Sequence, residues 1–203
     1  MNFRLDTNHH LLFALSFGGF LFISILISVA PAVRLEQKVQ AMKPEYRHMT
    51  EAQERGLRVF VRENCAACHT QQVRNVRMDE QWGRPSEPRD YAYLKPLSTW
   101  IMTPMMLGSA RVGPDLANVG NRRDNDMWNF IHLYEPRSVV PESIMPSYKW
   151  LFEAKENPQP GELLVTVPGE FRPDGKVLAP TQDAKDLLSF LMRLKQEKDK
   201  DQN

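Results

Sequence analysis

The chemistry in this sequence is concentrated in one short run, Cys65-Ala66-Ala67-Cys68-His69, which holds both cysteines of the chain. Two thiols spaced this way on a turn can reach the two vinyl groups of one haem, and the adjacent imidazole then lies against the iron as an axial ligand. A C-x-x-C-H run is typical of covalent c-type haem attachment. The sequence therefore predicts one covalent haem c, bound by Cys65, Cys68 and His69, with no thiol left over.

Two other readings of the cysteine pair fit the sequence less well. A thioredoxin-like redox pair should open a helix within a βαβ unit, and the surrounding pattern shows no such unit. A zinc site needs a second pair of ligands, and the chain has no further cysteine to supply it.

The second axial ligand of the haem has to be found by position among ten methionines. Met145 is the strongest candidate, because it lies in an extended loop late in the chain and Pro146 restricts the backbone directly after it. Methionine sulfur raises the haem potential, which suits electron transfer. The rivals are three methionines near Gly108 and one histidine: Met102, Met105, Met106 and His132.

Six further residues are candidates for the surroundings of the haem. The ring N–H of a haem-ligating histidine usually donates to a carbonyl or carboxylate, and Pro114 offers a carbonyl in a Gly-Pro turn. A plain turn without this role is the alternative. Arg74 and Arg77 closely follow the motif, where they could pair with haem propionates, contact a partner subunit or simply face solvent. Trp82, Tyr91 and Tyr93 could cover the haem edge or a partner, and the sequence does not separate these roles.

The composition excludes several classes of protein. The 203 residues contain 26 Lys plus Arg against 25 Asp plus Glu, so a formal net charge of +1 excludes a polybasic nucleic-acid binder and an acidic disordered tail. Two cysteines cannot build a disulfide-dense scaffold. The mean hydropathy of −0.47 is that of a soluble protein, but it hides one local extreme.

That extreme is the uncharged run from Leu11 to Ala30. A helix of this length spans about 30 Å, the thickness of the hydrocarbon core of a bilayer. A cleavable signal peptide is the alternative, and Ala30-Pro31-Ala32 fits a cleavage site. The apolar run is nevertheless longer than the usual range of roughly 7–15 residues for a signal peptide. We therefore expect an uncleaved, single-pass anchor that contacts membrane lipid.

The orientation of the anchor is predicted from chemistry rather than from charge. The basic residues near it are Arg4 before the run and Arg34, Lys38, Lys43 and Arg47 after it. This bias alone would keep the long C-terminal part in the cytoplasm. Covalent haem c attachment in bacteria takes place outside the cytoplasmic membrane, so we expect the C-terminal domain on the periplasmic side.

Helical patterns flank the motif. A capping box at Thr50 should open a helix that ends near Glu63, and Gly56 on this helix suits a close helix crossing. Two more helices are expected. They are a short one capped by Asp124 or Asp126 with Trp128, Ile131 and His132 on one face, and a last one capped by Thr181 with Leu187, Leu188, Leu191 and Leu194 toward the core.

Two stretches should lack regular helices. Residues 79–107 are rich in proline and aromatic residues and predict an irregular loop that wraps the surface. Residues 157–180 predict a hairpin-like excursion, with a strand over 163–167 and a turn at Pro173-Asp174-Gly175. The expected organisation is an N-terminal end (1–10), an anchor (11–32), a stalk (33–48) and a mainly α mono-haem cytochrome c domain (49–203) with long irregular loops and a small strand-like excursion.

The whole pattern resembles subunit II, the mono-haem c subunit, of the cbb3-type cytochrome c oxidases. The matching pieces, besides the anchor, are Met42-Lys43-Pro44, Gly56-Leu57, Val61 to His69, Gln71 or Gln72 with Arg74 and Arg77, Arg111 to Ala117, Val119-Gly120, Arg122, His132 to Ser143, Met145 to Tyr148, and Trp150-Leu151. Lys149 stands where the family usually has proline, and residues after 151 do not follow the pattern.

The resemblance implies axial ligands at His69 and Met145. It also implies a role in an oxidoreductase complex of the respiratory chain: electron transport toward a catalytic subunit with haem b and a haem–copper centre, which reduces oxygen to water. A second haem c subunit is an expected partner, nucleic acid is not, and the oxygen-reducing site lies outside this chain. The alternatives are the c subunit of a related nitric oxide reductase, a stand-alone membrane-anchored electron shuttle, and a haem enzyme with an open iron site.

Overall fold

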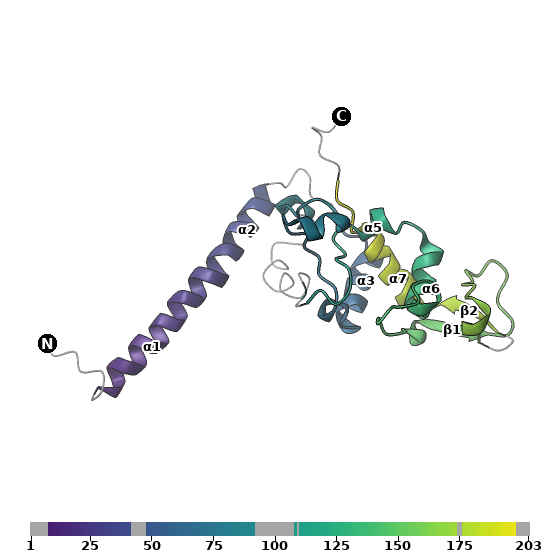
Figure 1. The fold of residues 1–203 in the computed structure, drawn as a ribbon, viewed down its shortest axis with the longest axis horizontal. Coiled ribbons are helices and arrows are strands. Elements are labelled where there is room, and N and C mark those ends of the chain that lie inside the picture. The colour runs from purple at the N-terminus through teal and green to yellow at the C-terminus, as the bar shows by residue number, and fades with distance from the viewer. Residues whose placement is uncertain (1–7, 42–47, 92–107, 109, 174–175, 198–203) are drawn as a thin grey trace.

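The computed structural model describes residues 8–41, 48–91, 108, 110–173 and 176–197 of the chain. Its longest feature is a helical rod that begins with α1 (His9–Ser24), continues as a π-helical turn over Ile25–Val29 and ends with α2 (Ala30–Ala41). Figure 1 shows this rod projecting away from the rest of the chain. The helix begins near the predicted start of the anchor and extends through the first part of the predicted stalk.

The rod is apolar enough to cross a membrane over His9–Lys38, and none of its most apolar window is buried within the protein. Pro31 explains the π-helical turn, because it has no N–H to donate and crowds the carbonyl one turn earlier. At the end of that turn the Ala30 N–H donates to the carbonyl of Ile25, five residues back. The helix thus absorbs the proline without breaking.

The folded domain is held together by the crossing of α3 (Glu51–Arg62) and α7 (Gln182–Arg193). The predicted capping box at Thr50 is present, because its side chain accepts from the Gln53 N–H and the Gln53 side chain accepts from the Thr50 N–H. Gly56 lies at the crossing, where a Cβ would overlap the backbone carbonyl of Asp186. The predictions of this helix and of its close crossing are confirmed.

Side chains from both helices form the centre of the core. Phe60 and Phe190 are almost fully buried, with ring centroids 5.6 Å apart. On the rim of the crossing, the Arg55 guanidinium donates to both carboxylate oxygens of Asp186 at 2.6 and 3.0 Å. The predicted cap of α7 by Thr181 is also confirmed, since its hydroxyl accepts from the Ala184 N–H.

Two short helices complete the described helical part of the domain. They are α5 (Val119–Arg122) and α6 (Asp126–Tyr134). The sequence predicted a cap at Asp124 or Asp126 for α6, and this was wrong: the cap is Asn125, whose side-chain oxygen accepts from the Trp128 N–H at 2.9 Å. Asp126 is the first helical residue instead, where its charge faces the positive end of the helix dipole.

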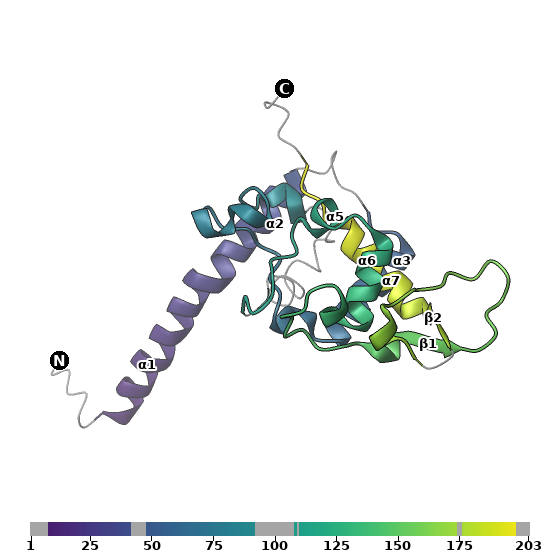
Figure 2. The ribbon, with the colours of Figure 1, turned by 45° about the vertical axis from the view of Figure 1, so that its right-hand side comes forward.

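The sequence correctly predicted a small strand-like excursion, but it predicted the strand at the wrong residues. The two described strands are β1 (Phe152–Lys155) and β2 (Val177–Pro180), which pair antiparallel with Phe152 opposite Pro180. Within the predicted strand 163–167, Val165 makes a single bridge to Leu178. Figures 1 and 2 place this ribbon at the end of the domain far from the helical rod. The predicted turn at Pro173-Asp174-Gly175 lies partly outside the described residues.

Candidate haem site

The cysteine–histidine motif lies on a turn directly after α3. Asn64 ends the helix in the left-handed conformation, with φ of 57°, which asparagine tolerates better than most residues. A 3₁₀ turn over Cys65–Ala67 follows, and the Cys65 carbonyl accepts from the N–H groups of Cys68 and His69. Both thiols are free and half-buried. One turn thus presents two thiols and an imidazole together.

The imidazole of His69 is oriented by the Gly113-Pro114 turn. Its Nδ1 lies 2.8 Å from the Pro114 carbonyl oxygen. A carbonyl can only accept, so Nδ1 carries the proton and Nε2 keeps a free lone pair. Burial lowers the pKa of His69, which keeps the ring neutral. The hydrogen bond expected between these two residues is therefore present, and it leaves Nε2 as the nitrogen able to ligate iron.

Gly113 makes room for this arrangement. Its N–H donates to the Cys68 carbonyl at 2.8 Å, which holds the turn against the motif. A Cβ at this position would overlap the ring atoms of His69. Any side chain at residue 113 would therefore push the imidazole or the turn away.

A buried carboxylate joins the same two segments. The Oδ2 atom of Asp115 accepts from the Thr70 hydroxyl at 2.6 Å and from the Gln72 N–H at 2.8 Å, while Oδ1 accepts from the Ala117 N–H. Asp115 is fully buried. The sequence analysis missed this role, although the sequence contains a signal for it. Thr70 follows His69 and Asp115 follows Pro114, so the contact between His69 and Pro114 also brings Thr70 close to Asp115.

The thiol of Cys65 contacts the loop that carries Met145. The Tyr148 side chain lies close enough to the Cys65 thiol to affect its pKa, and burial, with the charge of Glu63, raises the pKa of that thiol to about 12. Tyr148 packs edge-on against Trp150, with ring centroids 5.3 Å apart. The Trp150 N–H donates to Glu63 at 3.1 Å, which ties this aromatic pair back to the end of α3.

Met145 itself is half-buried and packs against the core, whereas its neighbour Ile144 is 74% exposed. The loop around it is attached to the end of α6. The Ser147 hydroxyl donates to Glu135 at 2.8 Å, and Glu135 also pairs with Arg137 at 3.0 Å. Met145 therefore belongs to a braced loop that reaches the cysteine turn through Tyr148. The rivals Met102, Met105 and Met106 lie outside the described residues.

The two candidate arginines lie apart from this turn in different settings. Arg74 donates to both carboxylate oxygens of Asp79 at 3.1 Å, and Arg111 pairs with the same carboxylate at 2.7 Å. Hydrogen bonds from Arg74, with the nearby charge of Arg111, lower the pKa of the buried Asp79 to about 2. Arg77 is exposed at the start of a 3₁₀ turn, Arg77–Trp82. Arg74 is thus already engaged in an ion pair with Asp79. Arg111 pairs with the same carboxylate, and the sequence analysis did not single out this role of Arg111.

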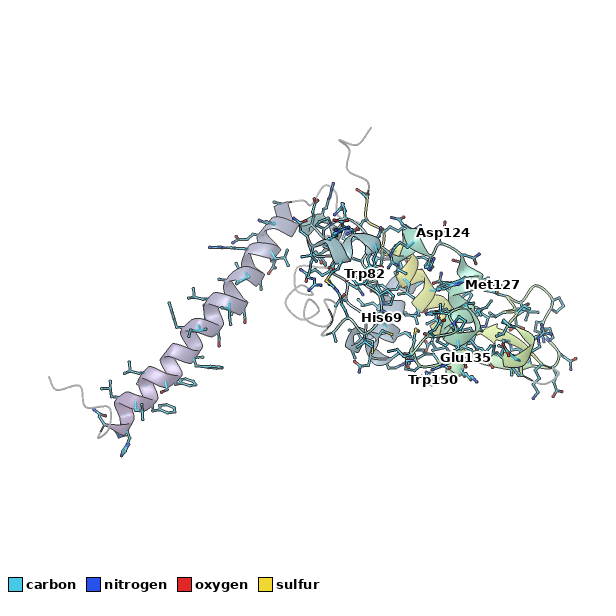
Figure 3. All side chains as sticks on the ribbon, in the orientation of Figure 1. His69, Trp82, Asp124, Met127, Glu135 and Trp150 are labelled. Carbon is cyan, nitrogen blue, oxygen red and sulfur yellow. The ribbon has the colours of Figure 1, made fainter. Side chains whose placement is uncertain are left out.

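The candidate aromatics cluster around the segment after the motif. The Arg111 guanidinium lies over the Trp82 ring, 5.3 Å from its centroid, and the Tyr91 hydroxyl donates to the Gln71 carbonyl at 3.0 Å. Figure 3 shows Trp82 and His69 on the side of the domain toward the helical rod. Tyr93 lies outside the described residues.

The donor set fits a haem better than a bare metal ion. A neutral imidazole with a free Nε2 and two thiols on the same turn match the attachment and proximal ligation of haem c. In the described part of the chain, no three His, Cys, Asp or Glu residues are grouped so that they could hold a metal ion by themselves. Gly113 leaves the space that the imidazole occupies, because a Cβ at this position would overlap the His69 ring.

A comparison with protein families decides the identity. The family described as "Cytochrome C oxidase, mono-heme subunit/FixO" matches residues 4–165 of the chain.

The chain belongs to this family. The resemblance to the mono-haem subunit of cbb3-type oxidase is thereby confirmed, as are the mainly helical fold with one apolar N-terminal helix and the assignment to electron transport with haem c. The match ends at residue 165, so β2 and α7 lie beyond it even though α7 completes the core. No curated protein sequence gives a significant match to the chain.

Proposed function

We propose that this FixO-family chain is the electron-transfer subunit of a cbb3-type terminal oxidase, and that it carries one covalent haem c. The observation that carries the proposal is the geometry of His69. Its Nδ1 is held by the Pro114 carbonyl and its neutral ring keeps Nε2 free, in a chain whose family is a mono-haem oxidase subunit. The bound haem supplies one-electron redox chemistry at this site.

Each residue of the turn has its own part. Cys65 and Cys68 hold the haem through thioether bonds, and the two thiols are the only ones in the chain. His69 is the proximal ligand. Pro114 and Gly113 are positioning residues: the first accepts the ring proton and the second leaves the space that the ring occupies.

Met145 is proposed as the second axial ligand. Its loop is braced by the hydrogen bond from Ser147 to Glu135 and by the contact between Tyr148 and Cys65. A thioether sulfur at this position would favour the ferrous state of a bound haem and would exclude small ligands from its iron. This arrangement supports electron transfer and argues against a haem enzyme with an open iron site.

The partners follow from the family and the anchor. The exposed apolar helix His9–Lys38 supports a membrane anchor, and membership of an oxidase-subunit family supports lipid and the catalytic haem b and copper subunit as its surroundings. A second haem c subunit is a further proposed partner. We place the domain on the periplasmic side, because covalent haem attachment takes place there in bacteria. Arg77, exposed beside the ion pair of Arg74 and Asp79, is proposed to contact a partner subunit.

Purification of the tagged chain from membranes in a mild detergent tests this function. We expect haem b and copper to purify with it, together with oxygen reduction that is supported by a reduced electron donor. If the preparation reduced nitric oxide instead, the chain would belong to a related reductase. If the chain came away alone with its haem, the stand-alone shuttle would be the correct function.

A further inference from the structure

The loop that carries Met145 is closed at its base by one buried carboxylate. Glu135 follows directly after α6 and is only 7% exposed. Its Oε2 atom accepts from the Ser147 hydroxyl at 2.8 Å, and its Oε1 atom accepts from the Arg137 guanidinium at 3.0 Å. The ammonium group of Lys149 lies 3.8 Å from Oε2. Glu135, Arg137, Ser147 and Lys149 together form the Glu135 cluster.

Glu135 is ionised, and its charge is compensated within the cluster. Burial by itself raises the pKa of this carboxyl group. The hydrogen bonds from Ser147 and Arg137, with the charge of Lys149, outweigh burial, so the pKa of Glu135 is lowered. Hydrogen bonds to an ionised carboxylate are roughly twice as strong as those between neutral groups. The charge of Glu135 is therefore what makes this closure of the loop firm.

The contacts of the cluster fix the backbone close to Met145. Ser147 lies two residues after Met145, and the next N–H along the chain, that of Tyr148, donates to the Leu133 carbonyl at 2.9 Å. This backbone bond and the side-chain bond from Ser147 to Glu135 reach the last turn of α6 and the residue directly after it. The position of the Met145 sulfur therefore depends on how firmly Ser147 and Tyr148 are held.

Lys149 adds a further contact with the end of α6. Its ammonium group lies near Glu135 and also over the ring of Tyr134, 5.6 Å from the ring centroid. A cation in this position is attracted by the negative face of the ring. Figure 3 shows Glu135 beside Trp150, which follows Lys149 in the chain. One lysine thus connects the C-terminal side of the loop with two consecutive residues at the end of α6.

We propose that Glu135 and Lys149 are positioning residues whose charge pair, completed by Arg137 and Ser147, holds the Met145 sulfur on the haem iron. The inference rests on the proposed function, because it needs a haem that Met145 ligates. It adds that the closure of the iron to small ligands is controlled by charges that do not touch the iron. Removing or reversing one of these charges opens the iron to a ligand such as carbon monoxide.

The first test uses the full-length haem-loaded protein and the variant Glu135→Gln. Glutamine keeps the size of the side chain and an oxygen that accepts from Ser147, but it leaves Arg137 and Lys149 without their anion. Carbon monoxide competes with Met145 for ferrous iron, so a weaker hold on the loop raises its apparent affinity. We expect this affinity to rise about tenfold, which corresponds to about 1.4 kcal/mol. The charge-transfer band of sulfur-ligated ferric haem should weaken in parallel.

A second variant, Lys149→Glu, changes an exposed side chain and leaves the core intact. It places a negative charge beside Glu135, so the affinity for carbon monoxide should again rise and the band should again weaken. The matched control is Glu142→Gln, which removes a charge from an exposed side chain of the same loop and should retain the wild-type affinity and band. Should Glu135→Gln fail to load haem, the comparison of Lys149→Glu with Glu142→Gln decides alone.

The outcomes separate this inference from a purely structural role and from the proposed function. A purely structural role of the cluster would lower the melting temperature of both variants and leave the carbon monoxide affinity and the band at their wild-type values, and that result would overturn the proposal. The proposed function would stand in that case. If the wild-type protein itself lacked the sulfur band, Met145 would not be the ligand, and the proposed function would fail at that point.

Discussion

Nδ1 of His69 lies 2.8 Å from the backbone carbonyl oxygen of Pro114, across 45 residues of sequence. This one contact determines which ring nitrogen bears the proton and therefore which one can face iron. It also depends on its neighbour, because the Gly113 N–H holds the turn against Cys68. Backbone groups thus set the orientation of the His69 imidazole. A substitution can change this orientation only by changing the shape of the Gly113-Pro114 turn.

Gly113→Ala should disturb the haem site without disturbing the fold elsewhere. The new methyl group would overlap the His69 ring, so the imidazole has to tilt or the turn has to withdraw. We expect a lower yield of haem-loaded protein and a lower midpoint potential. The control is Gly169→Ala, where nothing lies within 4 Å of the added carbon; equal effects of both substitutions would contradict the account.

Cys65→Ser with Cys68→Ser should abolish covalent haem. The wild-type chain is expected to hold one haem through acid–acetone extraction and denaturing electrophoresis, because a thioether survives both. The double variant has no thiol at all. Haem that stayed bound to it under denaturing conditions, or two haems per wild-type chain, would exclude the predicted attachment.

Asp79→Asn should weaken the domain in a way that depends on pH. The pKa of Asp79 is lowered to about 2, so its ionised form stabilises the folded state. That contribution is fully present above the unfolded pKa of about 3.9 and is lost as pH falls to about 2. The melting temperature of the variant should lie several degrees below that of the wild type at pH 7, and the gap should close between about pH 4 and pH 2.

The matched control for this prediction is Asp124→Asn, which makes the same change at an exposed carboxylate. Its melting temperature should follow that of the wild type across the same pH range. A gap for Asp79→Asn that stayed constant down to pH 2 would show that the carboxylate charge is not what stabilises the cluster.

Gly56→Ala should destabilise the crossing of α3 and α7. Alanine improves helix propensity by up to about 1 kcal/mol. The added carbon would, however, overlap the Asp186 carbonyl and crowd the Phe190 side chain, and overpacking of this kind costs typically about 1–3 kcal/mol. Chemical denaturation of the haem-loaded domain should therefore show a net loss of stability. A gain in stability would mean that the two helices can move apart at little cost.

The sequence predicted those features of the fold and site that depend on short-range rules. The two helix caps, the cysteine–histidine turn and the Gly-Pro turn are each encoded within a few residues, and the structure shows Thr50, Thr181 and Pro114 making the expected hydrogen bonds. Gly56 was placed correctly because only a residue without a side chain suits a close helix crossing.

The features that were missed depend on long-range pairing. Asp79 and Arg111 are 32 residues apart, and nothing local indicates that one buried carboxylate would take both Arg111 and Arg74. The strands were misplaced for a similar reason: 163–167 has the residues of a strand, but the partner of β2 is β1, which begins at Phe152 directly after a helical turn. Which residues form the strand is therefore determined by the long-range pairing, and not by strand propensity alone.

The redox titration of Met145→Ala tests the central claim most directly, with Met127→Ala as the matched control, since both methionines are half-buried against the same core. We predict that Met145→Ala loses the charge-transfer band of sulfur-ligated ferric haem and that its midpoint potential falls well below that of the wild type, while Met127→Ala retains both. An unchanged band and potential in Met145→Ala would show that another residue ligates the iron.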